Sequence, residues 1–151
     1  MNTTDKTTVL VADDEAPIRL LVRVNLEAEG YNVVEAPDGI ATLKLVREVN
    51  PDIVLLDVMM PGKDGWQVAE ELMSDDATAG IPVMFLTARA DLRDHERGLS
   101  AGALQYITKP FNPRTLAPSI QKCLEASQAG ETAAFRQERL RAVRELQSSP
   151  E

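Results

Sequence analysis

Short apolar runs alternate with amphipathic stretches along most of the chain, and a turn-forming segment follows each run. The clearest run is Ile53–Leu56, four consecutive apolar residues that end on Asp57. Such a run is typical of a parallel strand that is covered on both faces. The predicted strands are residues 7–12, 31–36, 53–57, 81–87 and 104–108.

Apolar residues recur every three or four positions between these runs, which predicts amphipathic helices. The first helix starts near Pro17, which suits a first turn, and ends at Gly30. Asn112 can cap the last helix, but Pro118 should kink this helix or delay its start. The other predicted helices are residues 40–49, 65–73 and 91–101.

The regular alternation of strand and helix over residues 7–127 predicts an α/β domain with a parallel sheet and helices on both faces. The 151 residues, 44% of them apolar, allow one ordinary domain plus an appendage. Residues 1–6 are expected to form a flexible N-terminus.

Residues 128–151 are expected to form a helical extension or a linker. Their apolar side chains share one arc of a helical wheel, which favours an interaction or dimerisation helix. A solvated tail is the open alternative, because so few apolar residues do not specify a coiled coil. The residues of this stripe are Phe135, Leu140, Val143 and Leu146.

Charge and cysteine content narrow the range of partners and locations. A net charge of −8 disfavours direct binding to nucleic acid or to an anionic membrane. The single cysteine, Cys123, excludes an internal disulfide, and its helical spacing to apolar neighbours predicts a buried thiol. With no apolar signal or spanning stretch, the expected location is cytoplasmic. The single histidine, His95, lies in a polar helix and is expected at the surface.

Polar residues at the ends of four predicted strands form the candidate site: Asp13 with Asp14, then Asp57, Thr87 and Lys109. Any one of these acids alone is commonly a turn residue. The carboxyl ends of parallel strands meet at one edge, so their joint occurrence favours a binding site. Carboxylates that repel each other favour a hard cation such as Mg²⁺. Asp57 can then act as a nucleophile for an aspartyl phosphate that Thr87 and Lys109 contact.

Four ordered segments resemble the receiver domain of two-component response regulators: Val9–Glu15, Leu55–Gly65, Leu86–Ala88 and Tyr106–Phe111. The resemblance covers residues 7–127 and implies a stand-alone receiver with the flavodoxin-like strand order 2-1-3-4-5. It also implies the ligands of Mg²⁺. These are Asp14, Asp57 and the backbone carbonyl of Met59, with Asp13 contributing directly or through water.

The same resemblance implies a signalling switch rather than an enzyme. Asp57 would take a phosphoryl group from a sensor histidine kinase or a histidine phosphotransfer protein and lose it by slow autodephosphorylation. Lys109 would pair with the phosphoryl group and Thr87 would move toward it. Tyr106 is similar to the aromatic residue that turns inward on activation and alters a face read by a downstream protein target. The Lys109–Pro110 bond resembles the family's cis peptide.

Two other functions remain open at this point. A pseudo-receiver that only binds partners would lack part of the site, whereas here every position is filled. A small phosphatase of the haloacid dehalogenase type would carry a second acid two residues after its nucleophile. Counted from Asp57, that position is Met59.

Overall fold

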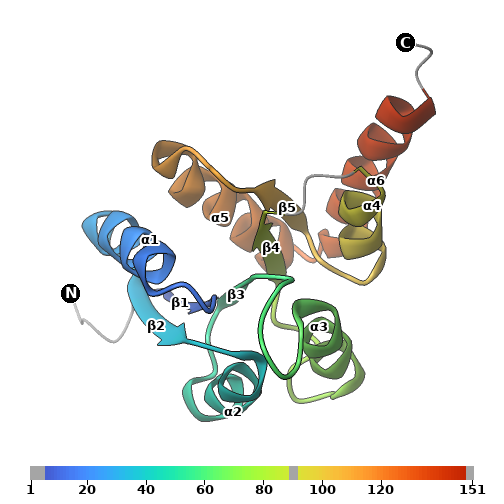
Figure 1. Ribbon diagram of the computed structural model, residues 1–151. Helices are drawn as coiled ribbons and strands as arrows, with labels where there is room; N and C mark the ends of the chain where they lie inside the picture. The colour runs from blue at the N-terminus through green and yellow to red at the C-terminus, as the bar shows by residue number, and fades with distance from the viewer. Residues whose placement is uncertain (1–5, 89–91, 149–151) are drawn as a thin grey trace.

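The computed structural model describes residues 6–88 and 92–148 (Figure 1). Strands and helices alternate in chain order up to the last strand, after which two helices follow. The elements are β1 (Thr8–Ala12), α1 (Ala16–Ala28), β2 (Asn32–Ala36), α2 (Gly39–Val49), β3 (Ile53–Leu56), α3 (Gly65–Ser74), β4 (Val83–Thr87), α4 (Leu92–Ser100), β5 (Gln105–Thr108), α5 (Pro113–Gln128) and α6 (Thr132–Ser148).

The five strands form one parallel sheet in the order β2-β1-β3-β4-β5, which confirms the predicted strand order. At the carboxyl edge, Ala12 lies opposite both Ala36 and Leu56, and Thr87 lies opposite Thr108. The residues that follow these strands therefore reach the same edge of the sheet.

Helices cover both faces of the sheet, as predicted (Figure 1). On one face, α1 and α5 bury Val22, Leu26 and Ile120 against residues of the central strands. On the other face, α2 and α3 bury Val46 and Leu72 against the same strands. No helix in the described ranges is both long enough and apolar enough to cross a membrane.

Of the two effects predicted for Pro118, a kink in the last helix or a delayed start, the delayed start was wrong. Helix α5 begins at Pro113 with Asn112 as its cap and continues through Pro118 to Gln128. Pro118 is exposed, whereas Leu116 and Ile120 on either side of it are fully buried. Burial of these two side chains offsets the loss of one helical hydrogen bond.

Helix α6 packs along α4 within the same chain (Figure 1). Leu140 and Val143 are buried against Leu99 of α4, in a small cluster separate from the two sheet cores. Phe135, near the start of α6, packs against the core beneath α5. Leu146 is 62% exposed. Most of the predicted apolar stripe therefore contacts its own domain.

Cys123 is fully buried, which confirms the buried thiol, and burial raises its pKa to about 11, against a smaller opposing effect of Arg139. The folded state thus favours the neutral thiol, so the stability this group contributes falls as the pH rises from 9.0 to about 11. We expect alkylation by iodoacetamide at pH 8 to be at least ~100-fold slower than in the unfolded chain. Equal rates in native buffer and in guanidinium chloride would contradict this burial.

Candidate functional site

Backbone hydrogen bonds extend the sheet one residue beyond the strands and fix the candidate acids. The Asp57 N–H donates to the carbonyl of Ala12 at 2.9 Å, and the Asp13 N–H donates to the carbonyl of Ala36 at 3.1 Å. The backbones of Asp13 and Asp57 are therefore held as firmly as the strands that they follow.

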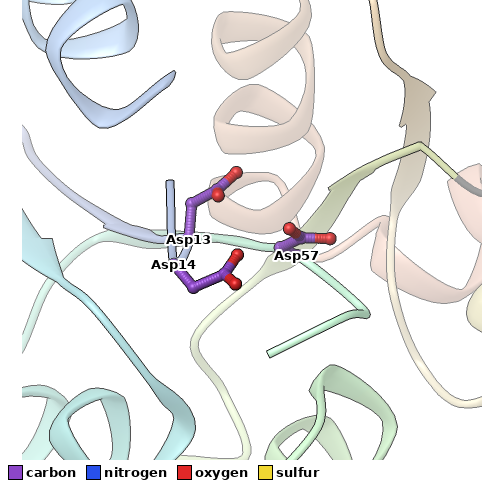
Figure 2. Close-up of side chains that lie close together, drawn as sticks. All are labelled: Asp13, Asp14 and Asp57. Atoms are coloured by element: carbon purple, nitrogen blue, oxygen red, sulfur yellow. The ribbon is translucent and has the colours of Figure 1, made fainter. Parts of the chain in front are cut away.

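The three predicted acids lie together at this edge, and Figure 2 shows their carboxylates grouped. Carboxylate oxygens of Asp13, Asp14 and Asp57 lie within 4.8 Å of one another. Asp13 and Asp57 are buried, whereas Asp14 is exposed. Burial raises the pKa of Asp13; the contact with Lys109 opposes this rise, and the charge of Asp57 adds to it.

Lys109 supplies the positive charge of the site. Its Nζ lies 2.6 Å from Asp13 Oδ2 and 3.1 Å from Asp57 Oδ2. Burial alone would lower the pKa of Lys109, but its contact with Asp13 and the charges of Asp57 and Asp13 hold that pKa well above its ordinary value. The Lys109 N–H donates to the carbonyl of Thr87 at 2.7 Å, and the Lys109–Pro110 peptide is cis.

The remaining predicted residues surround this cluster. The Met59 N–H donates to Asp57 Oδ1 at 3.1 Å, which places the Met59 backbone beside the acids. Thr87 ends β4 and is fully buried. Tyr106 is only 6% exposed, with its ring centroid 5.9 Å from that of Phe85. Its side chain therefore already occupies the inward position that the resemblance associates with activation.

His95 is not the plain surface residue that was predicted. Its ring centroid lies 4.0 Å from that of Tyr106, and its Nε2 lies 3.1 Å from Thr108 Oγ1. The reason is that α4 lies against β5, which brings a polar helix over the Tyr106 ring.

Two further side chains near the acids escaped sequence reasoning. Glu15 Oε1 lies 3.3 Å from Lys109 Nζ, so it adds a third carboxylate around this ammonium group. An Arg19 guanidinium N–H donates to the carbonyl of Asp13 at 2.6 Å and so anchors the Asp13 backbone. The position of Glu15 directly after Asp13 and Asp14 could have indicated its role, but no sequence signal pointed to Arg19.

The acids fit a magnesium ion. Their donors are all carboxylate oxygens, the ligands that hard cations prefer. Asp13 is buried, and its Oδ2 already meets one cationic group, the ammonium of Lys109 at 2.6 Å, so the site is built to hold positive charge against its carboxylates. A surface hollow lined by Asp14, Met59 and Trp66, among others, adjoins the cluster and gives access to it.

Gly65 allows α3 to start directly against the backbone of the site. A Cβ at position 65 would lie 2.3 Å from the carbonyl oxygen of Asp57 and 2.7 Å from the Cα of Val58. We expect Gly65→Ala to lower the free energy of unfolding by about 1–3 kcal/mol, because backbone atoms must move to admit the methyl group.

Gly80→Ala is the matched control for this glycine, because no atom lies within 4 Å of a Cβ built there. Urea unfolding of both variants measures the difference. Equal free energies of unfolding for Gly65→Ala and Gly80→Ala would show that the backbone of Asp57 moves without an energetic penalty and is not tightly held.

Comparisons with known proteins identify the family. Residues 9–121 match the response regulator receiver domain. The phosphate regulon transcriptional regulatory protein PhoB of Escherichia coli is 45% identical over 113 residues, which are 75% of this chain and 49% of that protein. PhoB of Pseudomonas aeruginosa is 39% identical over 127 residues, which are 84% of this chain and 56% of that protein. The chain spans about half the length of these curated relatives.

Solved structures agree with the sequence relatives. The chemotaxis response regulator CheY4 of Vibrio cholerae superposes with a TM-score of 0.73 at 30% identity, covering 78% of this chain and 98% of that one. A CheY-like response regulator receiver domain protein from Methanospirillum hungatei superposes with a TM-score of 0.77 at 28% identity, covering 83% and 99%. Sequence, fold and the acidic edge of the sheet agree, and the chain belongs to the response regulator receiver domain family of two-component signalling.

Proposed function

We propose that this chain is a phosphorylation-dependent response regulator whose phosphoryl acceptor is Asp57. The observation that carries the proposal is the environment of the Asp57 carboxylate. It is buried, its Oδ2 lies 3.1 Å from the ammonium of Lys109, and two further carboxylates lie close enough to share a cation. Such a group combines a nucleophile with nearby positive charge.

The donor is the phosphohistidine of a sensor histidine kinase or of a histidine phosphotransfer protein. An Asp57 oxygen attacks the phosphorus atom, the bond between phosphorus and the imidazole nitrogen breaks, and its electron pair stays on that nitrogen. The ammonium of Lys109 offsets charge on the phosphoryl oxygens, and the Thr87 hydroxyl donates a hydrogen bond to one of them. Bound at Asp13, Asp14, Asp57 and the Met59 carbonyl, Mg²⁺ supplies the positive charge that three carboxylates and a phosphoryl group require.

Receiver domains are signalling switches rather than classical enzymes. The output proposed for this one is a change of surface. Thr87 and Tyr106 are the proposed switch residues, and the altered face is read by a downstream protein target in the cytoplasm. Slow autodephosphorylation of Asp57 returns the switch to its resting state. Thr87 lies opposite Thr108 in the β4–β5 pair, and Thr108 is two residues beyond Tyr106 on β5. This arrangement supports a short path from the acidic site to the altered face.

Intact-protein mass spectrometry with phosphoramidate tests the proposal. We expect the mass to rise by one phosphoryl group when Mg²⁺ is present and to stay unchanged when EDTA removes it. Phosphoramidate replaces the unidentified kinase because it carries the same type of bond between phosphorus and nitrogen. Absence of the added mass at saturating Mg²⁺ would overturn the assignment of Asp57 as acceptor.

A further inference from the structure

Helix α4 has two contact faces, and α6 occupies the outer one. Leu99 is buried together with Leu140 and Val143 of α6, and these three residues form a cluster of their own. On the same side of α4, Arg144 Nε donates to Glu96 Oε2 at 2.7 Å. An apolar contact and an ion pair thus fix α6 in one register along α4.

The inner face of α4 lies on the switch tyrosine. The His95 ring lies against the Tyr106 ring, tilted by 37°. Gly98 also packs against this tyrosine: a Cβ at position 98 would lie 2.9 Å from Tyr106 Cδ2 and 3.0 Å from Phe85 Cδ2. Only a helix with no side chain at that position can approach so closely. The depth at which Tyr106 is buried therefore depends on where α4 lies.

Polar and aromatic contacts hold the inner side of α4: His95 lies against Tyr106, and the Arg97 guanidinium lies 4.4 Å from the centroid of the Trp66 ring. The sequence of α4, LRDHERGLS, contains only two large apolar residues, and the second of them, Leu99, is buried against α6 and not in either sheet core. Burial of apolar surface is the main source of helix stability in a domain. The buried apolar contact that Leu99 gives α4 is therefore made with α6 and not with the sheet.

A short link keeps α6 close to this surface. Residues 129–131 connect α5 to α6, and Gly130 turns the chain with a φ of +73°. The Glu131 N–H donates to the carbonyl of Ala126 at 2.8 Å, which closes the turn. Because the link is short, α6 is always near α4, even when it is not docked.

We propose that α6 of the same chain is the resident occupant of the outer face of α4 and that it clamps α4 over Tyr106. Release of α6 and exposure of Tyr106 are then two parts of one coupled equilibrium. A change that loosens α6 loosens the Tyr106 pocket, and by reciprocity a change that moves Tyr106 weakens the docking of α6. Because Tyr106 already lies in the inward position associated with activation, phosphorylation of Asp57 favours docked α6, and this step rests on the proposed function.

The single histidine is a direct reporter for this clamp. His95 is the only histidine of the chain, so its ring signals in an NMR spectrum need no assignment by mutation. In full-length Leu140→Ala we expect these signals to move as the contact with Tyr106 loosens, and amide exchange in α4 to become at least ~10-fold faster. Leu146→Ala, on the same helix but at an exposed position, should leave both unchanged.

A charge exchange provides a second test with little risk to folding, because both partners of the ion pair are partly exposed. Arg144→Glu should shift the His95 signals in the same direction as Leu140→Ala. Adding Glu96→Arg should restore them, whereas the control Arg141→Glu, at an exposed position of α6, should have no effect. If the α6 amides exchange faster in these variants while the His95 signals and the exchange of the α4 amides stay unchanged, the clamp is refuted.

The link to phosphorylation is measured separately with beryllofluoride, a phosphoryl analogue, and Mg²⁺. We expect α6 docking and beryllofluoride binding to influence each other, so that Leu140→Ala changes the affinity for beryllofluoride by at least ~5-fold. Equal affinities for the wild type and the variant would contradict this coupling. Failure of the wild type to bind beryllofluoride would contradict the proposed function instead, because the NMR and exchange measurements use no analogue.

Discussion

Asp57→Asn is expected to abolish phosphorylation by phosphoramidate. An amide oxygen carries no negative charge and is a far weaker nucleophile than a carboxylate, so no phosphorylated product should form. The fold should survive, because the change preserves shape and removes one of several crowded negative charges. We expect the free energy of unfolding to fall by no more than about 1 kcal/mol. Mass spectrometry and urea unfolding of the same preparation measure both results.

Asp76→Asn is the matched control, since it makes the same chemical change at an exposed position away from the acidic cluster. This variant should accept phosphate as the wild type does. Labelling of Asp57→Asn at the wild-type yield would mean that another residue is the acceptor, and peptide mapping of the labelled protein would then locate it.

Lys109→Met is expected to have the largest effect on stability. The ammonium is nearly buried between Asp13 and Asp57, and its removal leaves their charges unpaired. Breaking a buried ion pair in this way costs about 3–5 kcal/mol of unfolding free energy. The pKa of Lys109 is raised in the fold, so its stabilising charge is present below 10.5 and is lost only as the pH rises through the higher folded value. Phosphorylation should also slow by about 10²-fold.

Lys63→Met serves as the control for this lysine. Lys63 pairs with Glu71, and both side chains are about 40% exposed, so its loss should cost less than about 1 kcal/mol. Mg²⁺ should recover part of the stability of Lys109→Met, because a bound cation can offset the same carboxylates. Equal stabilities of the two variants in EDTA would refute the charge-balancing role of Lys109.

The acidic edge could be predicted because it depends on local pattern and one topological rule. The apolar run Ile53–Leu56 followed by Asp57 indicates a buried strand with an acid at its end, and parallel strands bring such ends together. The same reasoning predicts that Asp13 and Lys109 lie at this edge of the sheet. The structure brings all three within ion-pair distance.

Contacts that depend on how a helix lies over the sheet could not be predicted. The polar sequence of α4 favoured a surface position for His95, and nothing local shows that this helix rests on Tyr106. The rule applied to Pro118 considered the backbone alone and left out burial of the neighbouring apolar residues. For α6 the apolar stripe was evident, but periodicity does not say which surface it meets, and Leu99 of α4 could not be identified as the partner.

The three-residue link before α6 also determines how strongly α6 competes with other helices for this face of α4. A helix tethered by a short link acts at a local concentration on the order of millimolar. Any free helix that binds the same face of α4 must compete with α6 at that local concentration. The local concentration of α6 does not depend on how many copies of the protein the cell contains. Selectivity at this surface therefore depends on tether length as well as on side-chain chemistry. A longer link would lower the local concentration of α6, so other helices would bind this face of α4 more readily although no contact had changed.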